Sequence, residues 1–134
     1  AEYADILERE LAEFKPLKLF GKVKAKDRQL IVDLFNQENE YKVCVITDAA
    51  SHGLNLHKQA NSQIFCEVPF SLGKKTQVLG RLQRFGQEKE VNVYYLLALN
   101  KGKKTIDHHI KKISERKAVV SNKILRADVE GLLE

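Results

Sequence analysis

Two arginines, Arg81 and Arg84, are the residues of this chain with the clearest capacity for chemistry. They lie in the stretch Gln77 to Gln87, whose apolar residues have helical spacing. On a helix, a separation of three residues places both guanidinium groups on one face, and the planar, multi-donor guanidinium suits the binding of phosphate. The structural alternative is a basic helix end that is capped by Gly86. Spacing alone leaves both interpretations open.

A second stretch, Thr47 to Leu56, precedes the arginines and reads Thr-Asp-Ala-Ala-Ser-His-Gly-Leu-Asn-Leu. Together the two stretches resemble motifs V and VI of superfamily-two helicases. The Gly-Leu-Asn-Leu run that starts at Gly53, and the Gly-Gln pair that starts at Gly86, resemble the Swi/Snf-like branch of DNA translocases. The resemblance extends from about Leu19 to Lys117, and the order and spacing of the motifs make it specific.

The resemblance implies an α/β fold, a three-layer RecA-like domain whose mostly parallel sheet carries helices on both faces. It places the C-terminal RecA-like lobe of a helicase at residues 1–117 and a C-terminal helical tail at residues 118–134. The implied activity is that of a DNA-dependent ATPase that translocates on double-stranded DNA and whose two lobes close on ATP. ATP and Mg²⁺ would be its cofactors, with Mg²⁺ bound mainly by the N-terminal RecA-like lobe. That lobe and double-stranded DNA would be its partners.

The same resemblance implies a nucleotide-facing set of residues. Arg84 matches the arginine finger, and Arg81 matches its partner on the phosphates. Gln77 occupies the position from which motif VI reaches the γ-phosphate or the other lobe, although a solvated helix start is the structural alternative. Gly53 and Asn55 match the side of motif V that faces the nucleotide and the arginine stretch.

The resemblance also implies a track for one DNA strand. Thr47 and Ser51 match positions near the nucleic-acid backbone, where hydroxyls and backbone amides can bind phosphate without reading sequence. Gly21, Lys26 and Arg28 match a motif that flanks the same track. The structural alternative for this basic run is a solvated, charged surface.

Two further residues of motif V have open roles. Asp48 could belong to the site or could form the turn of its own loop. His52 departs from the glycine or glutamate that is common at its position, and an exposed loop residue is its structural alternative.

Composition indicates one globular, intracellular domain. The chain has 134 residues and a net charge of +5, a modest bias towards a polyanion. Cys44 and Cys66 lie in apolar runs and are expected to be buried thiols, which suits a reducing cytoplasm or nucleus. The histidines show no metal-ligand spacing with the cysteines, and we expect no metal site in this chain. We expect neither a signal peptide nor a membrane span.

The pattern of apolar residues predicts strands that alternate with helices, which indicates βαβ units and a parallel sheet. Helices are expected at Ala1–Phe14, Lys26–Gln37, Leu72–Phe85 and Lys103–Lys117, strands at Leu17–Phe20, Val43–Thr47, Gln63–Val68 and Val91–Leu99, and a further helical tail at Ala118–Glu134. The expected buried faces comprise Leu30, Ile31, Leu34 and Phe35 in one helix and Val78, Leu79, Leu82 and Phe85 in the arginine helix. Thr105-Ile106-Asp107 partly matches an element near the end of the Swi/Snf core and is expected to start a helix.

The sequence contains no Gly-x-x-x-x-Gly-Lys-Ser/Thr phosphate loop and no Asp-Glu pair of the kind that holds magnesium. In the family both belong to the first lobe, so we expect this chain to supply half of an ATPase and to be inactive alone. The family's second lobe also opens with a buried strand before its first helix. Here a helix is expected almost from residue 1, so either the chain is a cut fragment or residues outside the given sequence supply that strand. Motif VI begins with Gln77 instead of histidine, which disfavours a DEAD-box RNA helicase.

The alternative function is a catalytically inactive helicase lobe that acts as a binding module for nucleic acid or protein. The presence of both arginines argues against this alternative, because a scaffold does not need them.

Overall fold

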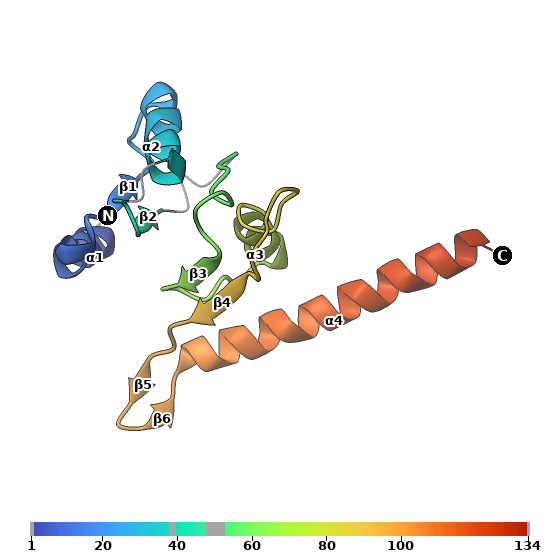
Figure 1. The fold of residues 1–134 in the computed structure, drawn as a ribbon. Helices are drawn as coiled ribbons and strands as arrows, with labels where there is room; N and C mark the ends of the chain where they lie inside the picture. The colour runs from blue at the N-terminus through green and yellow to red at the C-terminus, as the bar shows by residue number, and fades with distance from the viewer. Residues whose placement is uncertain (1, 38–39, 48–52, 134) are drawn as a thin grey trace. The chain divides into compact units, whose positions relative to one another are not determined.

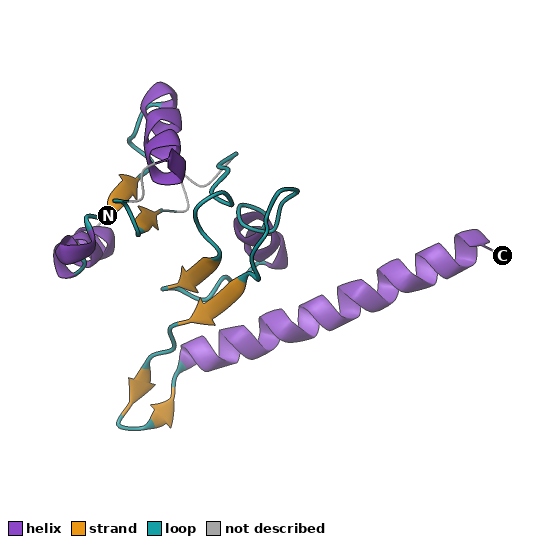
Figure 2. Cartoon of the chain, viewed as in Figure 1, coloured by secondary structure: helices purple, strands orange, loops and turns teal. Residues whose placement is uncertain are grey.

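The computed structural model describes residues 2–37, 40–47 and 53–133, and its helices and strands alternate along much of the chain (Figures 1 and 2). The elements are α1 Glu2–Glu10, η1 Ala12–Phe14, β1 Leu17–Leu19, α2 Ala25–Gln37, β2 Cys44–Ile46, β3 Ser62–Phe65, α3 Leu72–Leu79, β4 Asn92–Tyr95, β5 Leu99–Asn100, β6 Lys103–Lys104 and α4 Ile106–Leu133. The chain forms two compact units. The first unit comprises Ala1–Ser62 and Val78–Asn92, and the second comprises Gln63–Gln77 and Val93–Glu134.

A parallel strand pair forms the centre of the first unit. β1 pairs with β2, and Leu19 lies opposite Ile46. Backbone hydrogen bonds continue this ladder at its end, where the Thr47 N–H donates to the Leu19 carbonyl at 3.0 Å. α1 packs against β2 and α2 packs against β1, so the pair has a helix on each side (Figure 1). The predicted βαβ unit is confirmed here.

The core of the first unit collects side chains from several distant segments. Leu19 is fully buried and Leu82 is 2% exposed. The other buried members are Val32 and Phe35 of α2 and Leu54 and Leu56 of the segment between β2 and β3. The segments that resemble motifs V and VI therefore share one core. The expected inward position of Leu30 is wrong, because α2 turns Val32 inward and leaves Leu30 57% exposed.

The second unit contains most of β3 and β4, which are hydrogen-bonded neighbours. The Leu96 N–H donates to the Phe65 carbonyl at 3.0 Å, and the Asn92 N–H donates to the Asn61 carbonyl at 2.8 Å. In both hydrogen bonds the donor and the acceptor are separated by the same number of residues, as expected for two parallel strands. The Phe65 and Tyr95 rings stack with their centroids 5.1 Å apart.

A hairpin that the sequence did not predict follows β4. β5 and β6 are antiparallel, with Leu99 opposite Lys104. Lys101 and Gly102 connect them with φ angles of 48° and 76°. Two positive φ angles in a two-residue loop are the signature of a type I′ turn. The strand expected at Val91–Leu99 is therefore interrupted.

A single helix, α4, replaces the expected helix and tail. Its start agrees with the prediction for Thr105, whose N–H donates to His108 Nδ1 at 3.3 Å. The Thr105 hydroxyl donates to the Ala98 carbonyl at 2.7 Å, and Asp107 accepts from the Ala98 N–H at 3.0 Å. These bonds fix the first turn to the preceding segment. α4 runs without a break through residue 117, so the boundary of the lobe at that residue stays a prediction.

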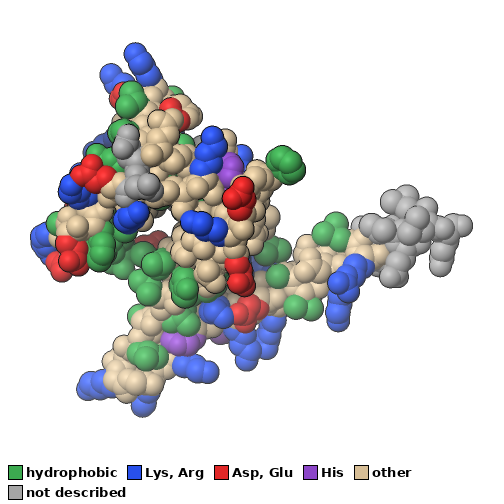
Figure 3. All heavy atoms as spheres, viewed as in Figure 1, with side chains coloured by type: hydrophobic (Ala, Val, Ile, Leu, Met, Phe, Trp, Pro, Cys, Tyr) green, Lys and Arg blue, Asp and Glu red, His purple; other side chains and the backbone are tan. Residues whose placement is uncertain are grey.

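Charge is distributed unevenly between the two units. In the first unit Lys and Arg equal Asp and Glu in number, so the whole net charge of +5 falls in the second unit. Figure 3 shows Lys and Arg side chains along α4 and at the β5–β6 hairpin. In the described part of the chain, no helix has the length and apolar character needed to cross a membrane.

Candidate functional site

The arginines do not lie on the expected helix. α3 ends at Leu79, just before Gly80 and the arginines. The next turn tightens, because the Arg81 N–H donates to the Val78 carbonyl at 3.2 Å and the Leu82 N–H donates to the Leu79 carbonyl at 3.0 Å. The prediction that one helical face carries both guanidinium groups is therefore wrong.

Arg84 is exposed and is held at two points. Its Nε donates to the Gly80 carbonyl at 2.5 Å. Its Nη1 donates to the side-chain oxygen of Asn55, and no hydrogen bond from Nη2 is found among the described residues. The structure thus joins the motif V and motif VI stretches at a guanidinium that still faces solvent. Guanidinium groups fixed in this way are well placed to bind an anion.

Arg81 lies inward and is only 4% exposed. Its carbonyl accepts the Leu56 N–H at 3.3 Å, a second link between the two stretches. Burial raises the pKa of the Cys44 thiol to about 12, and the positive charge of Arg81 partly opposes this effect. Arg81 and Arg84 therefore have different environments, one in the interior of the first unit and one at its surface.

The backbone of motif V explains why Asn55 reaches Arg84. Leu54 and Leu56 are buried at 6% and 5% exposure, so the residue between them points outward. The Asn55 carbonyl accepts a hydrogen bond from Asn36 Nδ2 at 2.8 Å, which anchors this residue to α2. Gly53 precedes the run with a φ of 70°, a conformation that favours glycine.

A turn follows Arg84 directly. The Gln87 N–H donates to the Arg84 carbonyl at 3.0 Å, and Gly86 has a φ of 94°. Glycine with positive φ at the third position is the arrangement of a type II turn. Phe85 occupies the corner and is fully exposed, at 105% of the reference area. The expectation that Phe85 is buried is wrong, because the helix that would have turned it inward ends at Leu79.

Gln87 is a structural residue of the site whose individual role was not predicted. Its Nε2 donates to the Ala60 carbonyl at 2.9 Å and to the Leu82 carbonyl at 3.2 Å. Its Oε1 accepts the Lys89 N–H at 3.1 Å. The Gly-Gln pair of the Swi/Snf-like resemblance was the signal that pointed to this position.

The residues predicted for a DNA track have varied environments. Thr47 is partly buried at the end of β2, and its hydroxyl has no hydrogen-bond partner among the described residues. Arg28 donates from Nε to the Val23 carbonyl at 2.8 Å and from Nη2 to the Gly21 carbonyl at 3.0 Å. Arg28 therefore braces the loop before α2, while Lys26 is exposed.

Some predicted residues cannot be compared with this geometry. Ser51, together with Asp48 and His52, lies outside the described residues. Gln77 is exposed on α3 and belongs to the second unit, whereas Arg84 belongs to the first. No group of three or more His, Cys, Asp and Glu side chains suited to a metal ion occurs where the structure is described.

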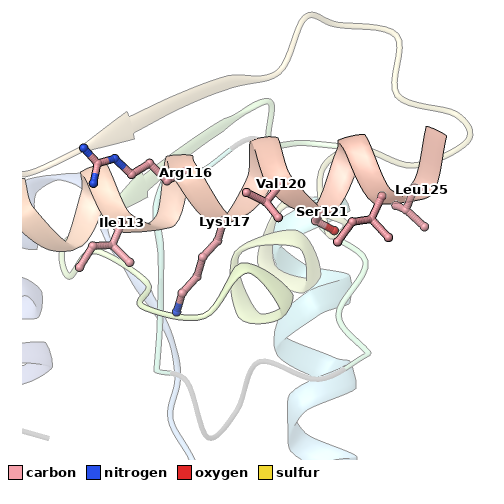
Figure 4. Close-up of a pocket in the computed structure, with 7 residues that line it drawn as sticks. Ile113, Arg116, Lys117, Val120, Ser121 and Leu125 are labelled. Atoms are coloured by element: carbon pink, nitrogen blue, oxygen red, sulfur yellow. The ribbon is translucent and has the colours of Figure 1, made fainter. Parts of the chain in front are cut away.

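A shallow groove runs along α4 (Figure 4). Its lining is apolar with cationic edges and includes Ile113, Lys117 and Val120. The Lys117 ammonium also lies 4.3 Å from the centroid of the Phe70 ring. None of the predicted site residues lines this groove.

Comparison with known proteins defines the class of this chain. Residues 1–86 match the family described as the helicase conserved C-terminal domain, and the chain belongs to that family. It is 32% identical to a solved structure, the C-terminal part of the Fun30 ATPase domain, with a TM-score of 0.72 over 82% of this chain and 35% of that one. The α/β, RecA-like fold is thereby confirmed.

Individual relatives define the branch. Over 84% of the length of this chain, it is 34% identical to Protein CHROMATIN REMODELING 19 of Arabidopsis thaliana. Over 97% of its length, it is 31% identical to the ATP-dependent helicase FUN30 of Saccharomyces cerevisiae. The TATA-binding protein-associated factor mot1 of Aspergillus fumigatus is 32% identical over 96%. The chain spans only 14%, 12% and 7% of these three relatives. It is the C-terminal RecA-like lobe of a Swi/Snf-like ATPase.

Proposed function

We propose that this chain is the second motor lobe of an ATP-dependent, Swi/Snf-like translocase that acts on double-stranded DNA. The observation that carries the proposal is the state of Arg84, which is exposed while Asn55 and Gly80 hold its guanidinium. An arginine restrained by its own lobe and open to solvent suits the role of a finger inserted into a neighbouring ATP site. Family membership supports the same role.

The proposed work of Arg84 is to stabilise negative charge on the departing γ-phosphoryl group. In other phosphoryl-transfer enzymes, an inserted arginine contributes about 10³–10⁵ in rate. Asn55 and Gly80 would keep the guanidinium in place before the lobes close, which reduces the reorganisation required. The Arg84 Nη2, which has no hydrogen bond among the described residues, is available to a phosphate oxygen.

The other nucleotide-facing residues have supporting roles in this proposal. Arg81 would add a second positive charge near the phosphates and fix motif VI through its carbonyl. Gly53 would permit the close approach of motif V, and Gln77 would contact the γ-phosphate or the other lobe. ATP supplies the phosphoryl group, and Mg²⁺ would be held mainly by the N-terminal lobe.

The proposed DNA track combines Thr47, Ser51, Gly21, Lys26 and Arg28. Arg28 would act through the backbone, because its bonds to the Gly21 and Val23 carbonyls fix the loop that approaches the strand. Lys26 would contact a phosphate directly. Contacts of this kind position a protein on DNA without selecting a sequence.

We place the protein inside the cell, in the cytoplasm or nucleus. Support comes from the two free cysteines and from a relative named as a chromatin remodelling protein. Free thiols are typical of reducing compartments.

Phosphate release by the purified chain and by the intact two-lobe protein, with and without duplex DNA, tests the proposal. The chain alone should show no turnover, because it lacks a phosphate loop. The intact protein should hydrolyse ATP faster when duplex DNA is present. Turnover by the chain alone that Arg84→Ala abolishes would contradict the half-site assignment, and an intact protein without ATPase activity would favour a binding module.

A further inference from the structure

Phe85 is an aromatic residue in an unusual position, immediately after the proposed arginine finger. Its side chain is fully exposed at 105% of the reference area, whereas Leu82, three residues earlier, is 2% exposed. Single exposed apolar residues are common on protein surfaces and carry no meaning by themselves. Phe85 differs from such residues because the backbone on both sides of it is held by hydrogen bonds.

The turn that carries Phe85 is fixed on both sides. Before it, Arg84 donates to Asn55 and Gly80. After it, the Gln87 side chain donates to the Ala60 and Leu82 carbonyls, and the Gln87 N–H closes the turn on the Arg84 carbonyl. A ring at the corner of a turn restrained in this way loses little further backbone freedom on binding, and such preorganisation favours affinity.

We infer that Phe85 is an apolar anchor for the N-terminal, ATP-binding lobe and inserts into an apolar recess on that lobe when the two lobes close. The inference rests on the proposed function, because Arg84 and Phe85 are consecutive and lie in the same turn. An Arg84 that reaches the ATP site carries the next residue of the same turn towards the protein surface around that site. Aromatic anchors in desolvated pockets provide much of the binding energy of protein interfaces.

In this proposal the Phe85 ring contacts protein and not the nucleotide base. Because the proposed role of Arg84 is to bind phosphate, the adjacent ring on the same short turn would lie near the phosphate end of ATP. The apolar contact would couple closure to the arrival of Arg84, so that the finger is presented only when the lobes are together. A closing step that completes a catalytic site is a common device in enzymes.

The test uses the intact two-lobe protein with one fluorophore on each lobe. Energy transfer is measured as a non-hydrolysable ATP analogue is added. Phe85→Ala should raise the analogue concentration needed for closure by about tenfold, and Phe85→Leu should retain most of the wild-type response. Leu30→Ala is the matched control, because Leu30 is also exposed in the first unit and should have no effect.

Each outcome decides a specific point. Wild-type closure that Phe85→Ala leaves unchanged would overturn the inference alone, whereas a wild-type protein that neither closes nor hydrolyses ATP would overturn the proposed function. Early melting of Phe85→Ala would mean that the ring packs within the fold, contrary to the inference. If a base-free triphosphate closes the wild type and Phe85→Ala equally while the ATP analogue does not, the ring contacts the base, and the protein anchor is wrong.

Discussion

Asn55 accepts a hydrogen bond from the guanidinium of Arg84, although the two residues are separated by 29 positions in the sequence. The bond joins a residue exposed between two buried leucines to an arginine that lies beyond the end of a helix. Its geometry depends on both segments being fixed by the core of the first unit. The proposed finger role of Arg84 requires such support, because a small misplacement of a reacting group is costly.

Substitution of Arg84 by alanine in the intact protein should reduce ATP turnover by about 10³ or more. Arg84 is exposed, so its loss opens no cavity, and the melting temperature should stay within a few degrees of the wild type. Arg84→Lys should restore little activity, because an ammonium lacks the planar fork. Phosphate release and thermal melting are the measurements.

Two controls make the Arg84 experiment decisive. Gln83→Ala alters an exposed neighbour and should leave turnover near the wild-type rate. Leu82→Ala creates a core cavity and should reduce the free energy of unfolding by about 2–5 kcal/mol. Early melting of Arg84→Ala with near-normal turnover would show that Arg84 is structural and that the finger assignment is wrong.

Asn55→Ala should lower turnover without removing the finger itself. The substitution deletes the acceptor that positions Arg84, and the misplaced guanidinium should lower turnover by up to about 10²-fold. Asn55→Asp keeps an oxygen acceptor and should recover much of the activity. Steady-state kinetics on both variants are the measurement, and equal activity of Asn55→Ala and the wild type would contradict the positioning role.

Binding of the chain to duplex DNA should be weak, insensitive to sequence and strongly dependent on salt. Lys26 is exposed, and Lys26→Gln should reduce the salt slope by about one unit. Lys42→Gln, a change at an exposed lysine outside the predicted track, should leave the slope unchanged. Fluorescence anisotropy on unrelated duplexes measures both effects, and an affinity that changes by orders of magnitude with sequence would refute the prediction.

Alkaline conditions should destabilise the fold through Cys44. Burial raises the pKa of this thiol from its ordinary 9.0 to about 12. Above pH 9.0 the unfolded chain loses the thiol proton while the folded chain retains it. The associated stability is therefore fully present below pH 9.0 and is lost as the pH rises towards 12. Urea unfolding from neutral to alkaline pH should show a steeper loss for the wild type than for Cys44→Ala, and parallel losses would contradict the assignment.

The parallel β1–β2 pair and the two motif segments could be predicted from the sequence, because continuous apolar runs and short motifs are local signals. The end of α3 could not, because the spacing of Val78, Leu82 and Phe85 fits a helix as well as the observed turns. Gly80 is the one local signal for the end of this helix, since glycine weakens a helix interior.

Because α3 ends before the two arginines, Arg81 and Arg84 do not share a helical face and have different environments. Burial of Arg81 depends on its neighbours in the core, including Cys44 of β2, and no local pattern specifies such a contact. The β5–β6 hairpin was also missed, although Lys101 and Gly102 stand where a two-residue turn forms. The apolar residues before the turn continue the pattern of a strand, so the sequence predicted one long strand in place of the hairpin.

Gln87 has a consequence for the internal motions of the first unit. Its side-chain amide donates to both the Ala60 carbonyl and the Leu82 carbonyl. The segment that contains Ala60 therefore cannot separate from the segment that contains Leu82 unless a hydrogen bond of Gln87 breaks. The two segments should therefore open together as one cooperative unit on the timescale of amide hydrogen exchange. Gln87→Ala would remove one link between the two segments and leave the bond from the Leu56 N–H to the Arg81 carbonyl, so the protection of the Leu56 and Leu82 amides should fall together.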